Sequence, residues 1–143
     1  MTSELAEILD EKGRRVHAIA ADASVYEAVE RMVALNVGSL LVTDGGEIAG
    51  IVTERDYLRR VALEGRTDRE TPVRDIMSSP LVVATLETTV EECMALMTDR
   101  RIRHVPVVAD GEIVGMVSIG DLVKFTSKKQ AFEIQYLTDY ITR

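Results

Sequence analysis

The stretch that decides the fold occurs twice: as DASVYEAVERMVALNVGSLLVTDGGEIAGIVTERDYLR at residues 22–59 and as ETTVEECMALMTDRRIRHVPVVADGEIVGMVSIGDLVK at residues 87–124. The two copies are offset by 65 residues and align without a gap. A duplicated unit implies a body with two-fold pseudosymmetry, in which matched clefts form where the halves meet. The inter-repeat clefts are therefore the expected place of function. Identical positions include Val25/Val90, Glu27/Glu92, Met32/Met97, Gly50/Gly115 and Asp56/Asp121.

Composition limits the class of protein. The chain has 143 residues, the length of one domain, so two units of about 60 residues should share one core. Its net charge of −7 argues against a broad nucleic-acid surface, because binding a nucleic-acid backbone needs dense positive charge. No apolar run approaches a membrane span, the first residues lack a secretory signal, and the single Cys93 suits a reducing interior. We expect a cytoplasmic protein that binds neither nucleic acid nor membrane.

Each repeat carries the pattern of an amphipathic helix. Ser24 with Glu27, and Thr89 with Glu92, form capping-box sequences, in which the hydroxyl and the carboxylate satisfy free amides of the first turn. Apolar residues then recur at helical spacing, which predicts one-sided helices. The two apolar faces are Val25, Ala28, Val29, Met32 and Val90, Cys93, Met94, Met97.

Short strands and tight turns make up the rest of each repeat. Gly45-Gly46 and Asp110-Gly111 supply the positive φ that hairpin turns need. A second helix is expected after the last strand of each repeat. Its expected buried face in the first repeat is Tyr57, Leu58, Val61 and Ala62. The predicted strands are 16–20, 39–43, 47–53, 81–84, 104–109 and 112–118.

Segments outside the repeats are also predicted to be helical. Leu5, Ile8 and Leu9 stand at helical spacing near the start of the chain. The last residues are apolar over a wide arc, from which we expect packing against a second copy in a homodimer. The expected organisation is an N-terminal helix at 1–15, units at 16–64 and 78–126, a connection at 65–77, and a C-terminal helix at 127–143.

Two tetrads could carry chemistry: Thr53-Glu54-Arg55-Asp56 and Ser118-Ile119-Gly120-Asp121. Each lies where a strand ends and a helix begins. A hydroxyl followed three residues later by an acid is an N-cap pattern, in which the acid merely complements the helix dipole. The same amides and hydroxyl could bind phosphate, and the carboxylate could accept from ribose hydroxyls. The residues alone leave both interpretations open.

The repeated unit resembles the CBS domain, named for cystathionine β-synthase. The resemblance rests on the signature Gly-x-hydrophobic-Ser/Thr-x-x-Asp at residues 50–56 and 115–121, on the lead-in sequence at 71–77, and on His104-Val105-Pro106-Val107-Val108. The whole chain resembles small stand-alone bacterial proteins made of one CBS pair. The implied fold is α/β: a tandem duplication of a βαββα unit forming a pseudo-two-fold pair, with helices at both ends.

The resemblance implies a ligand that contains adenosine. CBS pairs bind AMP, ADP, ATP, NAD(H) or S-adenosylmethionine between their repeats. Asp56 and Asp121 would hold ribose hydroxyls, while Thr53 and Ser118 would face phosphate or ribose oxygens. The implied lining at the start of each middle strand is Gly38, Ser39 and Leu40 in one repeat, and Arg103, His104, Val105 and Pro106 in the other.

The repeats differ in charge at matched positions. Arg55 of the first tetrad corresponds to Gly120, which leaves room for close backbone approach. A basic cluster in the second repeat is a candidate phosphate clamp. We favour a ligand role for Arg103 and His104, and a solvated helix end for Arg100 and Arg101. A sulfonium cation such as S-adenosylmethionine would be repelled by this cluster.

The function that follows is a non-catalytic sensor. Neither histidine forms metal-ligand spacing with Cys93, and no nucleophile has a base beside it, so we expect no metal and no catalytic residue. The sensor requires no cofactor, binds AMP, ADP, ATP or NAD(H) as a regulatory ligand, and signals occupancy to an enzyme or transporter. The alternative is a CBS-pair scaffold for dimerisation or docking whose clefts are vestigial. An enzyme is the third class, and no constellation of residues supports it.

Overall fold

The computed structural model describes residues 3–129 and divides into two compact units. The repeat-1 unit is Val16–Val82. The repeat-2 unit combines the described parts of Met1–Arg15 and Val83–Arg143. The N-terminal segment therefore belongs to the unit that contains the second repeat, although it directly precedes the first repeat in the sequence.

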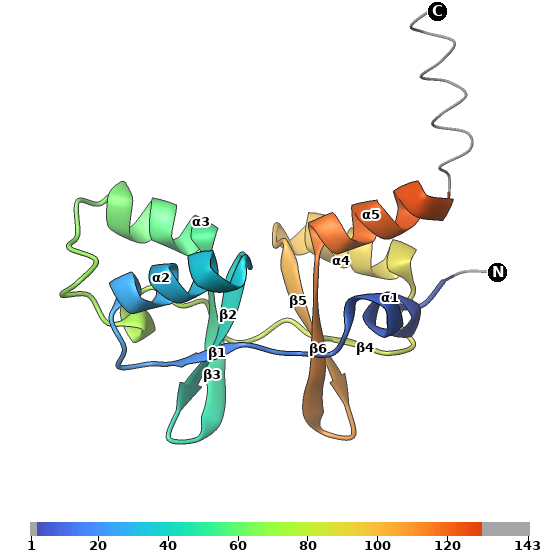
Figure 1. Ribbon diagram of the computed structural model, residues 1–143, viewed down its shortest axis with the longest axis horizontal. Helices are drawn as coiled ribbons and strands as arrows, with labels where there is room; N and C mark the ends of the chain where they lie inside the picture. The colour runs from blue at the N-terminus through green and yellow to red at the C-terminus, as the bar shows by residue number, and fades with distance from the viewer. Residues whose placement is uncertain (1–2, 130–143) are drawn as a thin grey trace, which may run out of the picture. The chain divides into compact units, whose positions relative to one another are not determined.

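The repeat-1 unit holds a three-stranded sheet of order β1-β2-β3 (Figure 1). Strands β1 and β2 are parallel, and β2 and β3 are antiparallel. Its elements are β1 Ala18–Ala20, α2 Val25–Leu35, β2 Ser39–Asp44, β3 Glu47–Thr53, α3 Glu54–Tyr57, a π-helical turn Leu58–Ala62 and a 3₁₀ turn Val73–Asp75.

The repeat-2 unit copies this arrangement with the sheet order β4-β5-β6. The pairing register repeats as well, since Leu40 pairs with Val52 and Val105 with Val117. The register also shifts at matched places, at Val42/Thr43 and at Val107/Val108. The elements are α1 Leu5–Lys12, β4 Ala84–Thr85, α4 Val90–Arg100, β5 His104–Ala109, β6 Glu112–Ser118 and α5 Ile119–Lys129. The predicted tandem α/β duplication is confirmed.

Two local predictions were wrong. The first strand of each repeat is shorter than expected, because only residues 18–20 and 84–85 pair with the neighbouring strand. In the second helix of repeat 1, Val61 is buried, but Leu58 is 60% exposed and Ala62 is exposed. The reason is that the Leu63 N–H donates to the Leu58 carbonyl, five residues back, at 3.0 Å. This wider π-helical turn rotates Ala62 away from the face that a regular α-helix would bury, whereas Leu58, where the turn begins, already lies outside that face.

The segments before each repeat pack into the unit of the other repeat. We call residues 3–9 and 71–77 the lead-ins. The Leu5 N–H donates to the Thr88 carbonyl at 2.9 Å, so the first lead-in is bound to repeat 2. The second lead-in is bound to repeat 1, since the Val73 N–H donates to the Ala23 carbonyl at 2.8 Å. The segment 65–77, expected to be a connection, thus contributes structure to the repeat-1 unit.

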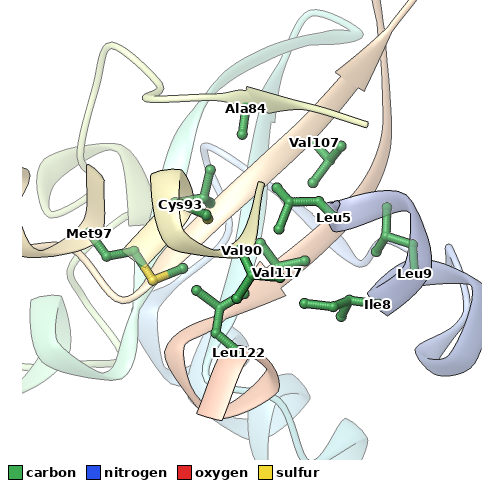
Figure 2. Close-up of a cluster of buried hydrophobic side chains, with 11 residues drawn as sticks. Leu5, Ile8, Leu9, Ala84, Val90, Cys93, Met97, Val107, Val117 and Leu122 are labelled. Atoms are coloured by element: carbon green, nitrogen blue, oxygen red, sulfur yellow. The ribbon is translucent and has the colours of Figure 1, made fainter. Parts of the chain in front are cut away.

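Each lead-in completes a hydrophobic core. In the repeat-2 unit, Leu5, Ile8 and Leu9 of α1 are at most 3% exposed (Figure 2). They share a cluster with Val90, Cys93, Met97, Val107, Val117 and Leu122. In the repeat-1 unit, Val73 and Ile76 are both fully buried in a second cluster that includes Val25 and Val52. The lead-ins are therefore core elements and not linkers.

The C-terminal prediction falls mostly outside the structure. Helix α5 continues to Lys129, past the expected unit boundary at 126. Residues 130–143, with the apolar arc from which a homodimer was expected, lie outside the described residues. Within 3–129, no helix is both long enough and apolar enough to cross a membrane.

Candidate functional site

The first tetrad forms a complete capping box. Thr53 ends β3 and is the N-cap of α3. Its N–H donates to Asp56 Oδ2 at 3.0 Å, and the Asp56 N–H donates back to Thr53 Oγ1 at 3.2 Å. Ser78, just beyond the second lead-in, donates its hydroxyl to Asp56 Oδ1 at 3.2 Å. Both carboxylate oxygens of Asp56 are thus engaged, and the residue is only 9% exposed.

The second tetrad has the same cap but a different outer partner. The Ser118 N–H donates to Asp121 Oδ2 at 2.8 Å, and the Asp121 N–H donates to Ser118 Oγ at 3.2 Å. Lys12, from the end of α1, forms an ion pair with Asp121 Oδ2 at 2.5 Å. Its ammonium also donates to the Met116 carbonyl at 2.8 Å. The side chain of Asp121 is 22% exposed, so it is more accessible than Asp56.

Lys12 was missed by the sequence analysis, although a pattern for it exists. Leu5, Ile8, Leu9 and Lys12 follow the i, i+3, i+4, i+7 spacing, so the lysine continues the buried stripe of α1. A lysine at the end of such a stripe places its apolar stem on the core and its ammonium at the rim. What the sequence could not reveal is that this stripe packs beside Asp121, because that contact joins residues 109 positions apart.

The start of each middle strand lies beside its tetrad. The Glu54 N–H donates to the Gly38 carbonyl at 3.1 Å, and the Ile119 N–H donates to the Arg103 carbonyl at 2.8 Å. In the sheets, Ser39 pairs with Thr53, and His104 pairs with Ser118. The structure therefore brings the predicted residues of each repeat together within that repeat's own unit.

Three of the predicted lining residues are buried. Leu40, Val105 and Pro106 are buried, and Leu40 and Val105 belong to the hydrophobic cores. Any contact of these two with a ligand would have to come from their backbone. The remaining lining residues, Gly38, Ser39, Arg103 and His104, lie at or next to the first residue of β2 or β5.

The positions that differ in charge between the repeats lie at the surface. Arg55, Arg103 and Gly120 are exposed, and His104 is half-buried. A Cβ atom at Gly120 would come no closer than 3.6 Å to Ser118 Oγ, so contacts within the protein do not require glycine there. Arg101 is the C-cap of α4, and Arg100 lies in its last turn, which agrees with the helix-end interpretation of both.

A polar pocket of about 350 Å³ opens beside Asp121. It lies between α1 and α5, and both of these helices belong to the repeat-2 unit. Its charged lining consists of Glu11, Lys12, Asp121, Lys124 and Lys128. In the repeat-1 unit, a more apolar pocket of about 440 Å³ is lined partly by Val33, Gly38, Glu54 and Leu58. Within residues 3–129, no three His, Cys, Asp or Glu side chains are grouped as metal ligands.

Two groups of helix α4 have shifted pKa values. The pKa of Glu92 is lowered, because its carboxylate accepts from the backbone N–H of Thr89 and, more weakly, from the Thr89 side chain. The stabilisation from this cap is present at neutral pH and is lost as the pH falls through the lowered pKa. Burial raises the pKa of the Cys93 thiol to about 11.

Cys93 is therefore expected to be unreactive in the folded protein. It is fully buried, and a pKa higher by about two units lowers the thiolate fraction at pH 8 roughly 100-fold. A colorimetric thiol reagent should label it rapidly in urea and far more slowly in buffer. Labelling in buffer at the rate seen in urea would contradict the buried position.

Comparison with known proteins agrees with this architecture. The CBS domain model matches residues 4–63 and 73–128. The chain belongs to the CBS-domain family. Each match to the CBS model begins within a lead-in. In the sequence, a CBS unit therefore consists of a lead-in and the repeat that follows it. In the structure, each lead-in instead packs on the other CBS repeat.

Several relatives cover most of the chain. The CBS domain-containing protein CBSX3, mitochondrial, of Arabidopsis thaliana is 42% identical over 98% of this chain and 72% of its own length. A candidate signal-transduction protein with CBS domains from Burkholderia ambifaria is 42% identical, with a TM-score of 0.86 over 90% of this chain and 96% of that one. A hexameric CBS-CP12 protein from bloom-forming cyanobacteria is 32% identical, with a TM-score of 0.77 over 86% of this chain and 71% of that one.

Proposed function

We propose that the protein is a non-catalytic regulatory module that binds AMP, ADP, ATP or NAD(H) and passes its occupancy to a partner protein. The observation that carries the proposal is the repeated arrangement at Thr53/Asp56 and Ser118/Asp121. In both units of this CBS-domain protein, a carboxylate and a hydroxyl meet at a strand end beside the start of the middle strand. Such a group of acceptors suits the hydroxyls of a ribose.

The Asp121 site is the better placed of the two for a ligand. Within the described residues, the Asp121 carboxylate accepts hydrogen bonds only at Oδ2. In Asp56, by contrast, Oδ1 also accepts a hydrogen bond, from Ser78. A carboxylate oxygen has two acceptor positions, so Oδ1 of Asp121 can take a ribose hydroxyl without breaking the cap. We therefore assign the tighter site to the repeat-2 unit.

A sensor role agrees with the relatives and with the chemistry of the site. The Burkholderia ambifaria protein is described as a candidate for signal transduction. Capped aspartates that are held by their own helix starts are suited to binding rather than to proton transfer. Signalling would require that the ligand bind one conformation more tightly than another, and the difference in affinity sets the size of the response.

Replacing the signature aspartates should weaken nucleotide binding. Asp121→Asn preserves an acceptor for the cap but removes the charge, and should lower the affinity for AMP or ATP by roughly tenfold or more, since hydrogen bonds to charged groups are the stronger ones. Asp56→Asn should have a smaller effect. The matched control is Glu92→Gln, the same change in the capping box of α4. In calorimetric titrations, Glu92→Gln should bind like the parent. If Asp121→Asn and Asp56→Asn both bind like the parent as well, the ribose assignment is rejected.

The second candidate function is a dimerisation or docking scaffold. Val33 and Leu58 are 75% and 60% exposed and line the apolar pocket of the repeat-1 unit. Exposed apolar side chains around a pocket favour contact with another protein. The cyanobacterial relative is described as hexameric, which supports self-association in this family. Light scattering that shows a homodimer, together with no heat on titration with nucleotides, would favour this function over the sensor.

A further inference from the structure

Helix α1 holds Lys12 in a defined position. Leu5, Ile8 and Leu9 are at most 3% exposed in the core of the repeat-2 unit (Figure 2). Lys12 follows on the same helix face, and its side chain is 38% exposed. The lysine is thus anchored by the buried turn before it, while its ammonium reaches the rim of the polar pocket.

Counting partners within residues 3–129, the ammonium of Lys12 has one donor left for a ligand. A lysine ammonium has three N–H donors. Two are taken, by Asp121 Oδ2 at 2.5 Å and by the Met116 carbonyl at 2.8 Å. Because Lys12 lines the pocket, the third donor can serve an acceptor that enters it.

The charge balance of the pocket favours an anion. Lys12 is paired with Asp121, and Lys128 with Glu11 at 3.7 Å. Lys124 lines the same pocket and has no ion pair within residues 3–129. The described lining of the pocket therefore has a net positive charge, within a chain whose net charge is −7. An unpaired carboxylate would repel phosphate, but the ion pair with Lys12 offsets the charge of Asp121.

The matched place in the repeat-1 unit lacks this cation. There the neutral hydroxyl of Ser78 donates to Asp56, so the charge of that aspartate is not balanced by an ion pair within the described residues. In the repeat-1 unit, the charge of Asp56 would therefore repel an anionic ligand. In the repeat-2 unit, Lys12 offsets the charge of Asp121, so an anionic ligand can approach. The difference originates in Lys12 and Ser78, which lie just beyond the lead-ins and outside the repeated stretches 22–59 and 87–124.

We propose that Lys12 is a phosphoryl-binding residue and that the repeat-2 site takes a phosphorylated adenosine ligand, whose phosphoryl oxygens contact Lys12 and Lys124. This inference rests on the proposed function and assigns the side chains that bind the phosphoryl group of its ligand. It excludes adenosine itself and cationic S-adenosylmethionine as preferred ligands of this site. Lys12 keeps its contact with Asp121 Oδ2, while a ribose hydroxyl uses Oδ1.

The test compares ligands that differ only in phosphorylation. ATP, AMP, adenosine and inorganic pyrophosphate are titrated calorimetrically into the parent, Lys12→Met, Lys12→Arg and Arg14→Met. Arg14 is the matched control, a cation two residues later that pairs with Asp10 and does not line the pocket. Lys12→Met should weaken ATP and AMP roughly tenfold or more and change adenosine less than about twofold. Lys12→Arg should restore most of the affinity, and Arg14→Met should match the parent.

The outcomes separate this inference from the proposed function. Equal losses for ATP and adenosine in Lys12→Met would show that Lys12 only positions Asp121, and would overturn the inference while nucleotide binding stands. Unchanged ATP binding in a folded Lys12→Met variant would overturn it as well. Pyrophosphate binding that depends on Lys12, without binding of any adenosine ligand, would support the phosphoryl site and reject the proposed function. If the parent binds neither nucleotide nor pyrophosphate, both are rejected.

Discussion

Ile8→Ala is expected to destabilise the repeat-2 unit by about 2–5 kcal/mol, the usual cost of truncating a buried isoleucine. Ile8 is 3% exposed and shares a cluster with Val117 and Leu122 (Figure 2). The cavity would open in the core that includes residues 83–129, although residue 8 lies closer to the first repeat in the sequence. Sequence proximity would instead place the damage in residues 16–64.

Hydrogen exchange with mass spectrometry can locate the loss. Ile8→Ala should reduce protection in α4, β5 and β6 and leave α2, β2 and β3 nearly unchanged. Ile76→Ala is the matched variant, since Ile76 is fully buried at the corresponding place of the second lead-in. Ile76→Ala should reduce protection in α2, β2 and β3 and leave α4, β5 and β6 nearly unchanged. If Ile8→Ala instead reduced protection in repeat 1, and Ile76→Ala in repeat 2, the packing of each lead-in in the unit of the other repeat would be contradicted.

Gly50→Ala is expected to cost about 1–3 kcal/mol, as overpacking of a filled site does. A Cβ atom at Gly50 would lie 2.6 Å from the backbone carbonyl oxygen of Ser78, which is held by its pairing with Ile51. At Gly115 the Cβ atom would meet the end of the Leu9 side chain at 2.7 Å. That flexible side chain can move, so Gly115→Ala should cost less.

Urea denaturation monitored by circular dichroism measures the loss of stability in each glycine variant. Gly120→Ala is the control, because the nearest atom to its Cβ position is 3.6 Å away. The expected destabilisation decreases from Gly50→Ala to Gly115→Ala to Gly120→Ala. A Gly50→Ala variant as stable as the parent would mean that the backbone at Ser78 does not approach β3 as closely as described.

The repeats themselves could be predicted because their signals are local. The N-cap at Ser24, the complete capping box at Thr89 and the hairpin turns at Gly45 and Asp110 lie within a few residues of the elements that they start or connect. Strands β3 and β6 accordingly have the predicted bounds, Glu47–Thr53 and Glu112–Ser118.

The packing of each lead-in in the unit of the other repeat could not be predicted in the same way. Leu5, Ile8 and Leu9 showed a helix with one apolar face, but not which core would receive it. That choice depends on contacts such as the bond from the Leu5 N–H to the Thr88 carbonyl, which joins distant parts of the chain. The π-helical turn at Leu58–Ala62 was not predicted either, because the apolar spacing of its residues was interpreted as a regular helix.

For the site, the sequence located the tetrads but not their outer partners. The cap and the ligand interpretation of Asp56 and Asp121 use the same local geometry, and the capping contacts are present in both units. Ser78 and Lys12, which set the charge around the two aspartates, lie just beyond the lead-ins and outside the repeated stretches. The ligand role of the aspartates remains a prediction.

The central claim is that this CBS pair binds an adenosine ligand, and calorimetric titration of the nucleotide-stripped parent tests it most directly. AMP, ATP, NAD, NADH and S-adenosylmethionine should be compared on protein whose fold is verified by circular dichroism. We predict saturable binding of at least one phosphorylated ligand with a Kd on the order of micromolar, tighter than that of S-adenosylmethionine. The absence of heat with all five ligands would contradict the sensor and favour the scaffold.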